Sequence, residues 1–146
     1  DEVINTAKQN KRLRGYAELI AQVRDQLAQV PILFDKEIQG GQVQLPYLNA
    51  TQFMHAFGDV CLAWALLWQA NIADEKLEAI RQMAGGANDK IKKSLIQHSK
   101  DAAFYAGKLA VARHFISNVL PVTRGRINAI NNEEQAAWDI AVESFL

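Results

Sequence analysis

Histidine, cysteine and carboxylate side chains are the residues of this chain that could do chemistry, and their spacing argues against a metal site. Helical bundles bind di-metal centres through Glu-x-x-His pairs, because this spacing puts both ligands on one side of a helix. The residues three positions before the histidines His55, His98 and His114 are Gln52, Leu95 and Val111. A single cysteine and three scattered histidines give no zinc spacing either. The sequence therefore predicts no metal ligand.

Catalytic and nucleotide-binding patterns are not favoured either. A nucleophile needs a histidine base and an orienting carboxylate, and the sequence leaves open whether such groups meet in space. We interpret His55 and His114 as hydrogen-bonded structural histidines on packed helices, and the adjacent acids Asp74 and Glu75 as surface charge. Gly107-Lys108 lacks the glycines and the hydroxyl residue of a phosphate loop. We expect no catalytic and no cofactor-binding residue in this chain.

Charge and cysteine content narrow the class of partner. Sixteen basic and sixteen acidic residues cancel, so no long-range field attracts nucleic acid or an anionic membrane. Cys61 is the single cysteine, which excludes an intramolecular disulfide and predicts a buried thiol in a reducing, cytoplasmic setting. The apolar run 60–68 is much shorter than the ~20 residues that span a bilayer, so we predict a core helix.

The spacing of apolar residues predicts a first long helix over 13–38. Pro31 lies inside this pattern, and because proline lacks a backbone donor and collides with the preceding turn, we expect a kink near 27–30. Gly40 and Gly41 should end the helix. The basic run from Lys8 to Arg14 is interpreted as a solvated helix junction, and 42–48, which contains Pro46, as an extended connection.

A second long helix is predicted over 49–84, starting at an Asn49–Gln52 capping box and ending at Gly85 and Gly86. Asn49-Ala50-Thr51 also matches a glycosylation acceptor, but a helix cap accounts for it better. Its apolar residues cover more than half of the circumference, which predicts packing on several sides. These residues are Phe53, Met54, Phe57, Val60, Cys61, Trp64, Leu67 and Trp68.

A third long helix is predicted over 101–130, opened by Asp101 and kinked or interrupted by Pro121. It carries two apolar stripes and so should also pack on two sides. Gly58 and Gly107 lie inside helical patterns, where glycine is costly, so we expect tight helix crossings there. A short helix over 133–145 should follow an Asn131–Glu134 capping box. The predicted fold is all-α, an antiparallel bundle of about four helices.

Several segments carry a family resemblance. They include Asn49–Ala70 (NATQFMHAFGDVCLAWALLWQA), Asp101–Pro121 (DAAFYAGKLAVARHFISNVLP) and the closing AAWDIAVESFL. Together they resemble the helical C-terminal extension that follows the flavin-binding core in one branch of the acyl-CoA dehydrogenases. That branch includes enzymes acting on 3-methylmercaptopropionyl-CoA. The likeness is a pattern of packing residues and is absent from 75–100.

The resemblance implies that 1–146 is a single α-helical C-terminal domain of a larger acyl-CoA dehydrogenase, with 1–10 the tail of an upstream helix. The parent reaction would be α,β-dehydrogenation of an acyl-CoA thioester with FAD. The family's base and flavin contacts lie in the preceding domains, so no catalytic or cofactor residue is carried over. The implied partners are the dehydrogenase core of the same chain and further subunits of a homo-oligomer, with a structural and assembly role for the helices.

The sequence is also compatible with two other functions. A stand-alone bundle could bind an acyl chain in a pocket lined by the aromatic residues Phe53, Phe57, Trp64, Trp68, Phe104 and Phe115. A short basic amphipathic segment could dock on a membrane or a protein, although its brevity argues against a membrane. Its residues are Lys90, Ile91, Lys92, Lys93, Leu95 and Ile96.

Overall fold

The computed structural model describes the backbone of residues 1–85 and 89–146, and the side chains of 1–85 and 94–146. Over these residues the chain forms seven α-helices and one 3₁₀ turn and no strand, which confirms the all-α class. The elements are α1 (Glu2–Gln9), α2 (Arg14–Leu27), α3 (Val30–Gln39), α4 (Gln44–Met83), α5 (Asp89–His98), α6 (Lys100–Asn118), α7 (Leu120–Ile130) and η1 (Val142–Phe145).

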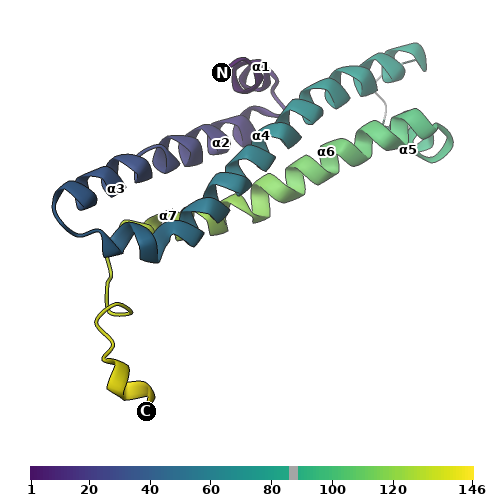
Figure 1. The fold of residues 1–146 in the computed structure, drawn as a ribbon. Helices are drawn as coiled ribbons and strands as arrows, with labels where there is room; N and C mark the ends of the chain where they lie inside the picture. Colours follow the sequence, from purple (N-terminus) through teal and green to yellow (C-terminus); the bar gives the residue numbers. More distant parts are fainter. Residues whose placement is uncertain (86–88) are drawn as a thin grey trace.

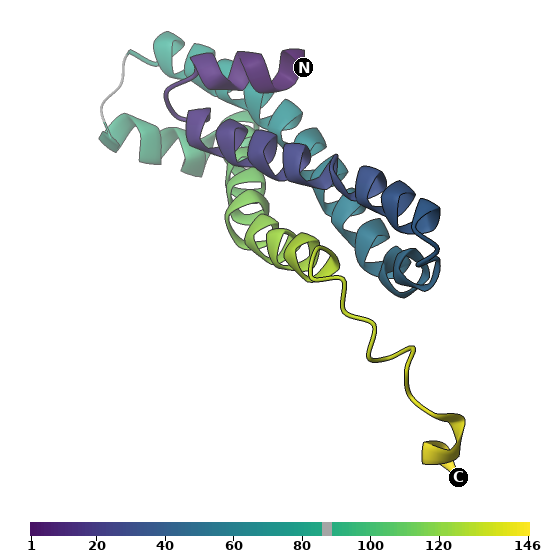
Figure 2. The ribbon, with the colours of Figure 1, turned by 90° about the vertical axis from the view of Figure 1, so that its left-hand side faces the viewer.

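The helices build three long antiparallel arms. α2 and α3 continue in one direction, α4 runs back beside them, and α6 followed by α7 returns along α4 (Figure 1). The fourth packing element is α1, which contacts both α2 and α4 (Figure 2). The predicted antiparallel bundle is therefore confirmed, with α4 at its centre, since α4 contacts each of the other α-helices of the described chain.

The core lies where α4 faces the other two arms. α4 contributes small and branched side chains at heptad-like spacing, which lets α6 and α2 approach closely. Its fully buried members include Ala56, Ala63, Leu67 and Ala70. From the other arms, Ile20, Val23, Ile116, Leu120, Ile127 and Ile130 complete the cluster.

Both predicted proline breaks are present. α2 ends at Leu27 and α3 begins at Val30, with Pro31 in its first turn. In the same way α6 ends at Asn118 and α7 begins at Leu120, with Pro121 in its first turn. A proline is tolerated there because the first-turn amides have no partner within the helix. The α2–α3 arm keeps its overall direction across the break (Figure 1), whereas α7 bends away from the axis of α6 (Figure 2).

Glycines end the helices as predicted. Gly41 has φ 81° just after α3, and Gly85 has φ 92° just after α4. Both angles lie in the left-handed region, which residues with a Cβ adopt at a cost. Gly86, which was predicted to end the second long helix together with Gly85, lies outside the described residues.

The start of α4 differs from the prediction. The helix begins at Gln44 rather than at Asn49, so the expected extended connection over 42–48 is largely helical. Pro46 falls in the first turn, where its missing N–H costs nothing. Asn49 is not a cap, since its Nδ2 donates to the Leu45 carbonyl one turn back (3.1 Å).

α6 is capped by Ser99 and not by Asp101. The Ser99 Oγ accepts a hydrogen bond from the Ala102 N–H at 3.3 Å, and Asp101 lies in the first turn. An acid there still complements the positive end of the helix. The capping residue was therefore misplaced by two positions, and the helix itself was predicted correctly.

The predicted helix over 133–145 is reduced to the 3₁₀ turn of η1, Val142–Phe145. Glu133 has φ 52°, which breaks a helical start at the proposed capping box. Short helices need tertiary packing to be stable. The segment 131–146 runs away from the bundle in both views (Figures 1 and 2), so it lacks such packing here.

The expected tight crossings at Gly58 and Gly107 are not present. A Cβ added at either glycine meets nothing within 4 Å, apart from its own helix and neighbours. Nothing in the described chain therefore requires a glycine at these two positions.

Replacing either glycine should stabilise the protein. We expect Gly58→Ala and Gly107→Ala each to raise the free energy of unfolding by about 0.5–1 kcal/mol, because alanine is the better helix former and has room. Urea denaturation followed by circular dichroism measures the change. Loss of stability in either variant would reveal a close contact and contradict this structure.

Glu37 is a buried carboxylate without a partner. It lies on α3, is 3% exposed, and neither of its side-chain oxygens has a hydrogen-bond partner among the described residues. Burial raises its pKa above the usual 4.5, the nearby charge of Glu133 raises it further, and Lys36 lowers it in part. The folded protein therefore disfavours the ionised form.

This pKa shift makes stability depend on pH. Since the folded pKa lies above the unfolded one, stability should fall as pH rises from about 4.5 through the raised folded value. The glutamine of Glu37→Gln cannot ionise, so this variant should lose less stability over the same pH range. The difference in free energy of unfolding in its favour should therefore be largest at neutral pH. Parallel urea titrations at pH 4 to 8 measure this. An equal pH dependence in both proteins would contradict the burial of an ionisable Glu37.

α4 meets the length and composition test for a membrane-spanning helix, with a mean hydropathy of 1.2 over its most apolar window. A third of that window, 33%, is buried within the protein. Val60, Ala63 and Leu67 are among the buried residues, so the run predicted as a core helix does contribute to the core.

Candidate docking surface

The three histidines are not brought together. His55 and His114 lie on α4 and α6 as predicted, but both side chains are exposed, and of the two only His114 has a hydrogen-bond partner among the described residues. Asn118 Nδ2 lies 3.3 Å from His114 Nδ1, and His98 Nδ1 lies 2.8 Å from the Ser94 carbonyl. Among the described residues no group of three His, Cys, Asp or Glu side chains could hold a metal ion.

An apolar groove lies between α1, the α2–α3 arm and α4. It has a volume of about 540 Å³, and the charged residue on its wall is Arg24, which pairs with Asp1 (3.0 Å) and Asp25 (2.7 Å). Its floor is buried aliphatic surface, and its rim is aromatic. The lining residues used below are Ile4, Ile20, Leu27, Phe53, Phe57 and Trp64.

An exposed apolar stripe runs along α4 beside this groove. We call it the α4 stripe: Met54, Phe57, Cys61, Trp64, Trp68 and Ile72. These residues recur at steps of three and four, so they share one side of the helix. Met54 is 73% exposed, Phe57 55% and Trp68 52%. The Trp64 and Trp68 rings lie 6.0 Å apart, so these two side chains form one aromatic patch within the stripe.

The predicted packing of α4 on several sides is confirmed by its contacts with every other described α-helix, but the α4 stripe shows that part of its apolar surface is left uncovered. Cys61 was expected to be buried and is exposed on the groove wall. On α6, the second predicted stripe is Phe104, Val111 and Phe115. Phe104 (58%) and Val111 (54%) are exposed, and Phe115 packs against the core. The apolar pattern was read correctly, but much of it faces away from this chain's own core.

The acyl-pocket residues are only partly assembled. Phe53, Phe57 and Trp64 line the apolar groove. Trp68 lies in a separate hollow against α1, and Phe104 packs beside Lys108, whose Nζ is 5.4 Å from the ring centroid. Phe115 packs against the core. The structure therefore brings three of the six together.

The segment 131–146 also exposes apolar side chains. Its large residues are mostly open to solvent: Trp138 61%, Ile140 49%, Val142 72%, Phe145 76%. Among the described side chains, one hydrogen bond joins it to the bundle, from Gln44 Nε2 to Gln135 Oε1 (3.1 Å). Together with the α4 stripe, this segment leaves a series of large apolar side chains uncovered, as is typical of an interaction surface.

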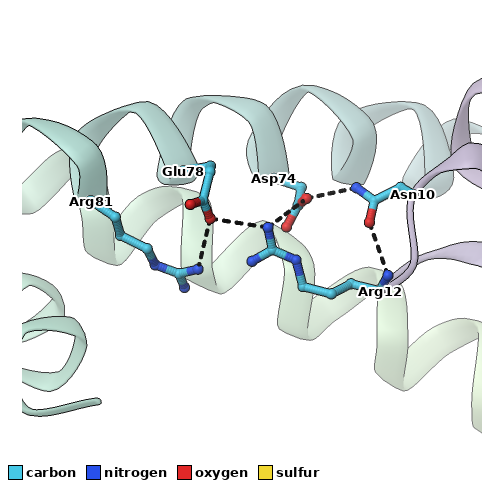
Figure 3. A network of polar contacts seen from close by, with 5 residues as sticks. All are labelled: Asn10, Arg12, Asp74, Glu78 and Arg81. Carbon is cyan, nitrogen blue, oxygen red and sulfur yellow. Dashed lines mark hydrogen bonds and ion pairs between the residues drawn. The ribbon is translucent and has the colours of Figure 1, made fainter. Parts of the chain in front are cut away.

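A polar network closes the junction between α1 and α2 (Figure 3). Asn10 Nδ2 donates to Asp74 Oδ2 at 2.6 Å, and the Arg12 guanidinium lies 3.3 Å from the same oxygen. Arg12 also bonds Glu78 (3.0 Å), which in turn lies 3.4 Å from Arg81. The hydrogen bond from Arg12 holds the pKa of Glu78 below its usual value. Within the basic run, Arg12 is therefore paired and Arg14 donates to the Lys8 carbonyl (2.9 Å), while its basic residues are exposed as predicted.

Asp74 was missed as a buried residue. It is 4% exposed, although adjacent acids were predicted to be surface charge. The signal was available in the register of α4, because Asp74 follows Leu67 by seven residues and Ala70 by four, on the buried side. Glu75, its neighbour, is exposed as predicted.

Comparison with known proteins decides the family. The family model described as "Acetyl-CoA dehydrogenase C-terminal like" matches residues 1–141. The chain belongs to this family. The predicted resemblance to the acyl-CoA dehydrogenases is thereby confirmed, and the match includes Asn49–Ala70, Asp101–Pro121 and the first half of the closing segment.

A curated relative of this acyl-CoA dehydrogenase C-terminal domain is the butyryl-CoA dehydrogenase of Syntrophomonas wolfei subsp. wolfei (strain DSM 2245B / Goettingen). The two are 31% identical over 116 residues, which is 79% of this chain and 17% of the relative. The chain thus spans about a sixth of that enzyme's length. No solved structure matches the domain.

Proposed function

We propose that this chain is the non-catalytic assembly domain of an FAD-dependent acyl-CoA dehydrogenase. In this proposal 1–146 is one α-helical C-terminal domain, 1–10 is the tail of an upstream helix, and the parent enzyme carries out the α,β-dehydrogenation of an acyl-CoA thioester with FAD. Family membership and the butyryl-CoA dehydrogenase relative support it. No catalytic, cofactor-binding or metal residue is assigned to this chain.

The observation that carries the assembly role is the α4 stripe beside the apolar groove. Tryptophan and phenylalanine at an exposed site are typical of interface anchors, because they bury much area with few rotatable bonds. The proposed partners are the dehydrogenase core of the same chain and a further subunit of a homo-oligomer. The exposed, unpaired Cys61 supports a reducing compartment, and we place the enzyme in the cytoplasm.

The test uses the full-length protein that contains this chain. Changing Trp64, Trp68 and Phe57 together to serine should reduce the oligomeric mass and the retained FAD, because each interface anchor contributes about 2 kcal/mol or more. Light scattering after size exclusion and flavin absorbance measure the two. Leu62→Ser, 48% exposed on the same helix but outside the stripe, is the matched control. Unchanged mass and flavin content in the triple variant would refute the assembly role.

A second function is favoured by the groove itself. Its apolar lining and volume of about 540 Å³ suit an acyl chain, which would make the domain a ligand-binding bundle. Titrating the 146-residue chain with butyryl-CoA and with a fatty acid, read by tryptophan fluorescence, separates the two functions. A saturable change that Phe53→Ser abolishes would favour acyl binding over docking. The basic docking segment at 90–96 lies mostly outside the described side chains, and only Leu95 and Ile96 are placed, both half-buried.

A further inference from the structure

A small hollow lies between α4 and α6. It has a volume of about 220 Å³, which is smaller than a typical small-molecule site. Phe104 on its wall is 58% exposed, so the chain itself leaves the hollow open. A hollow of this size suits one large side chain, which is how interface anchors bind. The wall consists of Gln69, Ile72, Ala73, Phe104, Tyr105 and Lys108.

The charge around this hollow is positive. From 100 to 130, α6 and α7 contain five basic residues and one acid, Asp101. At the hollow itself Lys108 contacts neutral groups, since its Nζ lies 2.9 Å from Gln69 Oε1 and 5.4 Å from the Phe104 ring centroid. Because complementary charge selects partners, this face suits an acidic partner and disfavours a copy of itself.

The segment 131–146 has the matching chemistry. It contains four acids and no Lys, Arg or His. Trp138, Val142 and Phe145 are spaced by four and three residues, so in a helix they would share one side, with Asp139 beside them. In this structure the segment forms only the short turn of η1, and Trp138 is 61% exposed. Its helical pattern therefore lacks a surface to pack against.

This segment does not reach the hollow of its own chain. Gln135 is held at the start of α4 by the 3.1 Å hydrogen bond from Gln44. Trp138 lies three residues farther on and extends at most about 11 Å from there. Gln69, at the hollow, follows Gln44 by 25 residues of one continuous helix, which is about 38 Å at 1.5 Å per residue. With this bond in place, the Trp138 that fills the hollow must come from another molecule.

We propose that the hollow between α4 and α6 receives Trp138 from the segment 131–146 of a second copy of this chain. The segment folds into a helix as it docks, and Asp139 pairs with Lys108. Each copy has one segment and one hollow, so the exchange is reciprocal and closes as a two-fold dimer. This inference rests on the proposed assembly role and adds a second contact surface to it, which meets the α4 stripe only at Ile72.

A zero-length carbodiimide cross-linker tests this in the full-length protein that contains this chain, because it joins a lysine directly to a carboxylate in contact with it. We expect a covalent dimer of twice the subunit mass, whose peptides show Lys108 linked to an acid of 131–146. The same linked peptides at the mass of one subunit would mean that the segment folds back on its own chain. That result, or no linkage between Lys108 and the segment, would overturn the proposal.

Two variants separate docking from chance cross-linking. Trp138→Ser keeps Lys108 and every acid of the segment, but it removes the anchor and should lower the yield of this linkage about tenfold or more. Ile140→Ser is the matched control, because Ile140 is 49% exposed and would lie on the opposite side of the docked helix. It should leave the yield unchanged. Equal yields from the two variants would contradict the role of Trp138 as the anchor.

This docking and the α4 stripe can fail separately. If the triple variant of the α4 stripe loses oligomeric mass and Lys108 is not linked to 131–146, the assembly role stands and this docking is wrong. If the linkage forms in the covalent dimer and the triple variant keeps its mass, the second copy docks through the hollow and the α4 stripe does not hold the subunits together.

Discussion

Leu67→Ala should cost about 2–5 kcal/mol in the free energy of unfolding, the largest effect we expect from a single substitution. Leu67 is fully buried at 0% exposure on α4, in the cluster that joins all three arms. Removing three carbons there loses burial and leaves a cavity that rigid neighbouring helices cannot fill. Domains of this size are stable by only about 5–15 kcal/mol, so the loss is a large share of the total.

Urea denaturation with tryptophan fluorescence and circular dichroism measures this loss. Leu62→Ala is the matched control, because it deletes the same atoms from the same helix at a position that is 48% exposed. Its effect should stay within about 0.5 kcal/mol. If the two substitutions cost the same, α4 would not be oriented as described, with Leu67 in the core and Leu62 outside.

Asp59→Ala should be the second most damaging change, at about 2–3 kcal/mol. Asp59 Oδ2 accepts from Thr123 Oγ1 at 2.8 Å and from Arg126 at 2.6 Å, and so ties α4 to α7. Thr123 is completely buried and Asp59 is partly buried, so these charge-assisted bonds are weakly screened. Thr123 keeps a longer bond to the Val119 carbonyl (3.2 Å), which limits the loss.

A double-mutant cycle with Thr123→Val measures the interaction free energy between the Asp59 and Thr123 side chains. Because the residues are in direct contact, the double variant should lose less than the sum of the two single losses. Asp139→Ala, an exposed acid of the 131–146 segment, removes the same charge and should leave stability unchanged. Strict additivity between Asp59 and Thr123 would contradict the bond between them.

The arms and their breaks could be predicted from sequence because each depends on local chemistry. Pro31 and Pro121 interrupt helices wherever they stand in a helical pattern, and Gly41 and Gly85 adopt angles that other residues avoid. The start of α4 could not be predicted in the same way. Pro46 is compatible with a loop and with a first turn, and only the packing of Leu45, which is 1% exposed, decides for the helix.

The candidate surface was harder to predict, because periodicity says that a face is apolar without saying what covers it. Trp64, Leu67 and Trp68 all belong to the apolar helical pattern of α4. Only the position of the other two arms shows that Leu67 is buried in the core. The same limit explains the segment at 133–145, whose apolar residues have no bundle surface to fold against. Asp74 is the opposite case. As a charged residue it was predicted to be exposed, but its position on α4 places it on the buried side of the helix.

The length of α4 has a mechanical consequence. Between Asp59 and Met83 the helix contains neither glycine nor proline, so it lacks the usual causes of a kink. At 1.5 Å per residue, this uninterrupted stretch of helix is about 36 Å long. A partner that binds at Trp64 and Trp68 therefore presses on a continuous helix whose other end packs against α5 and α6.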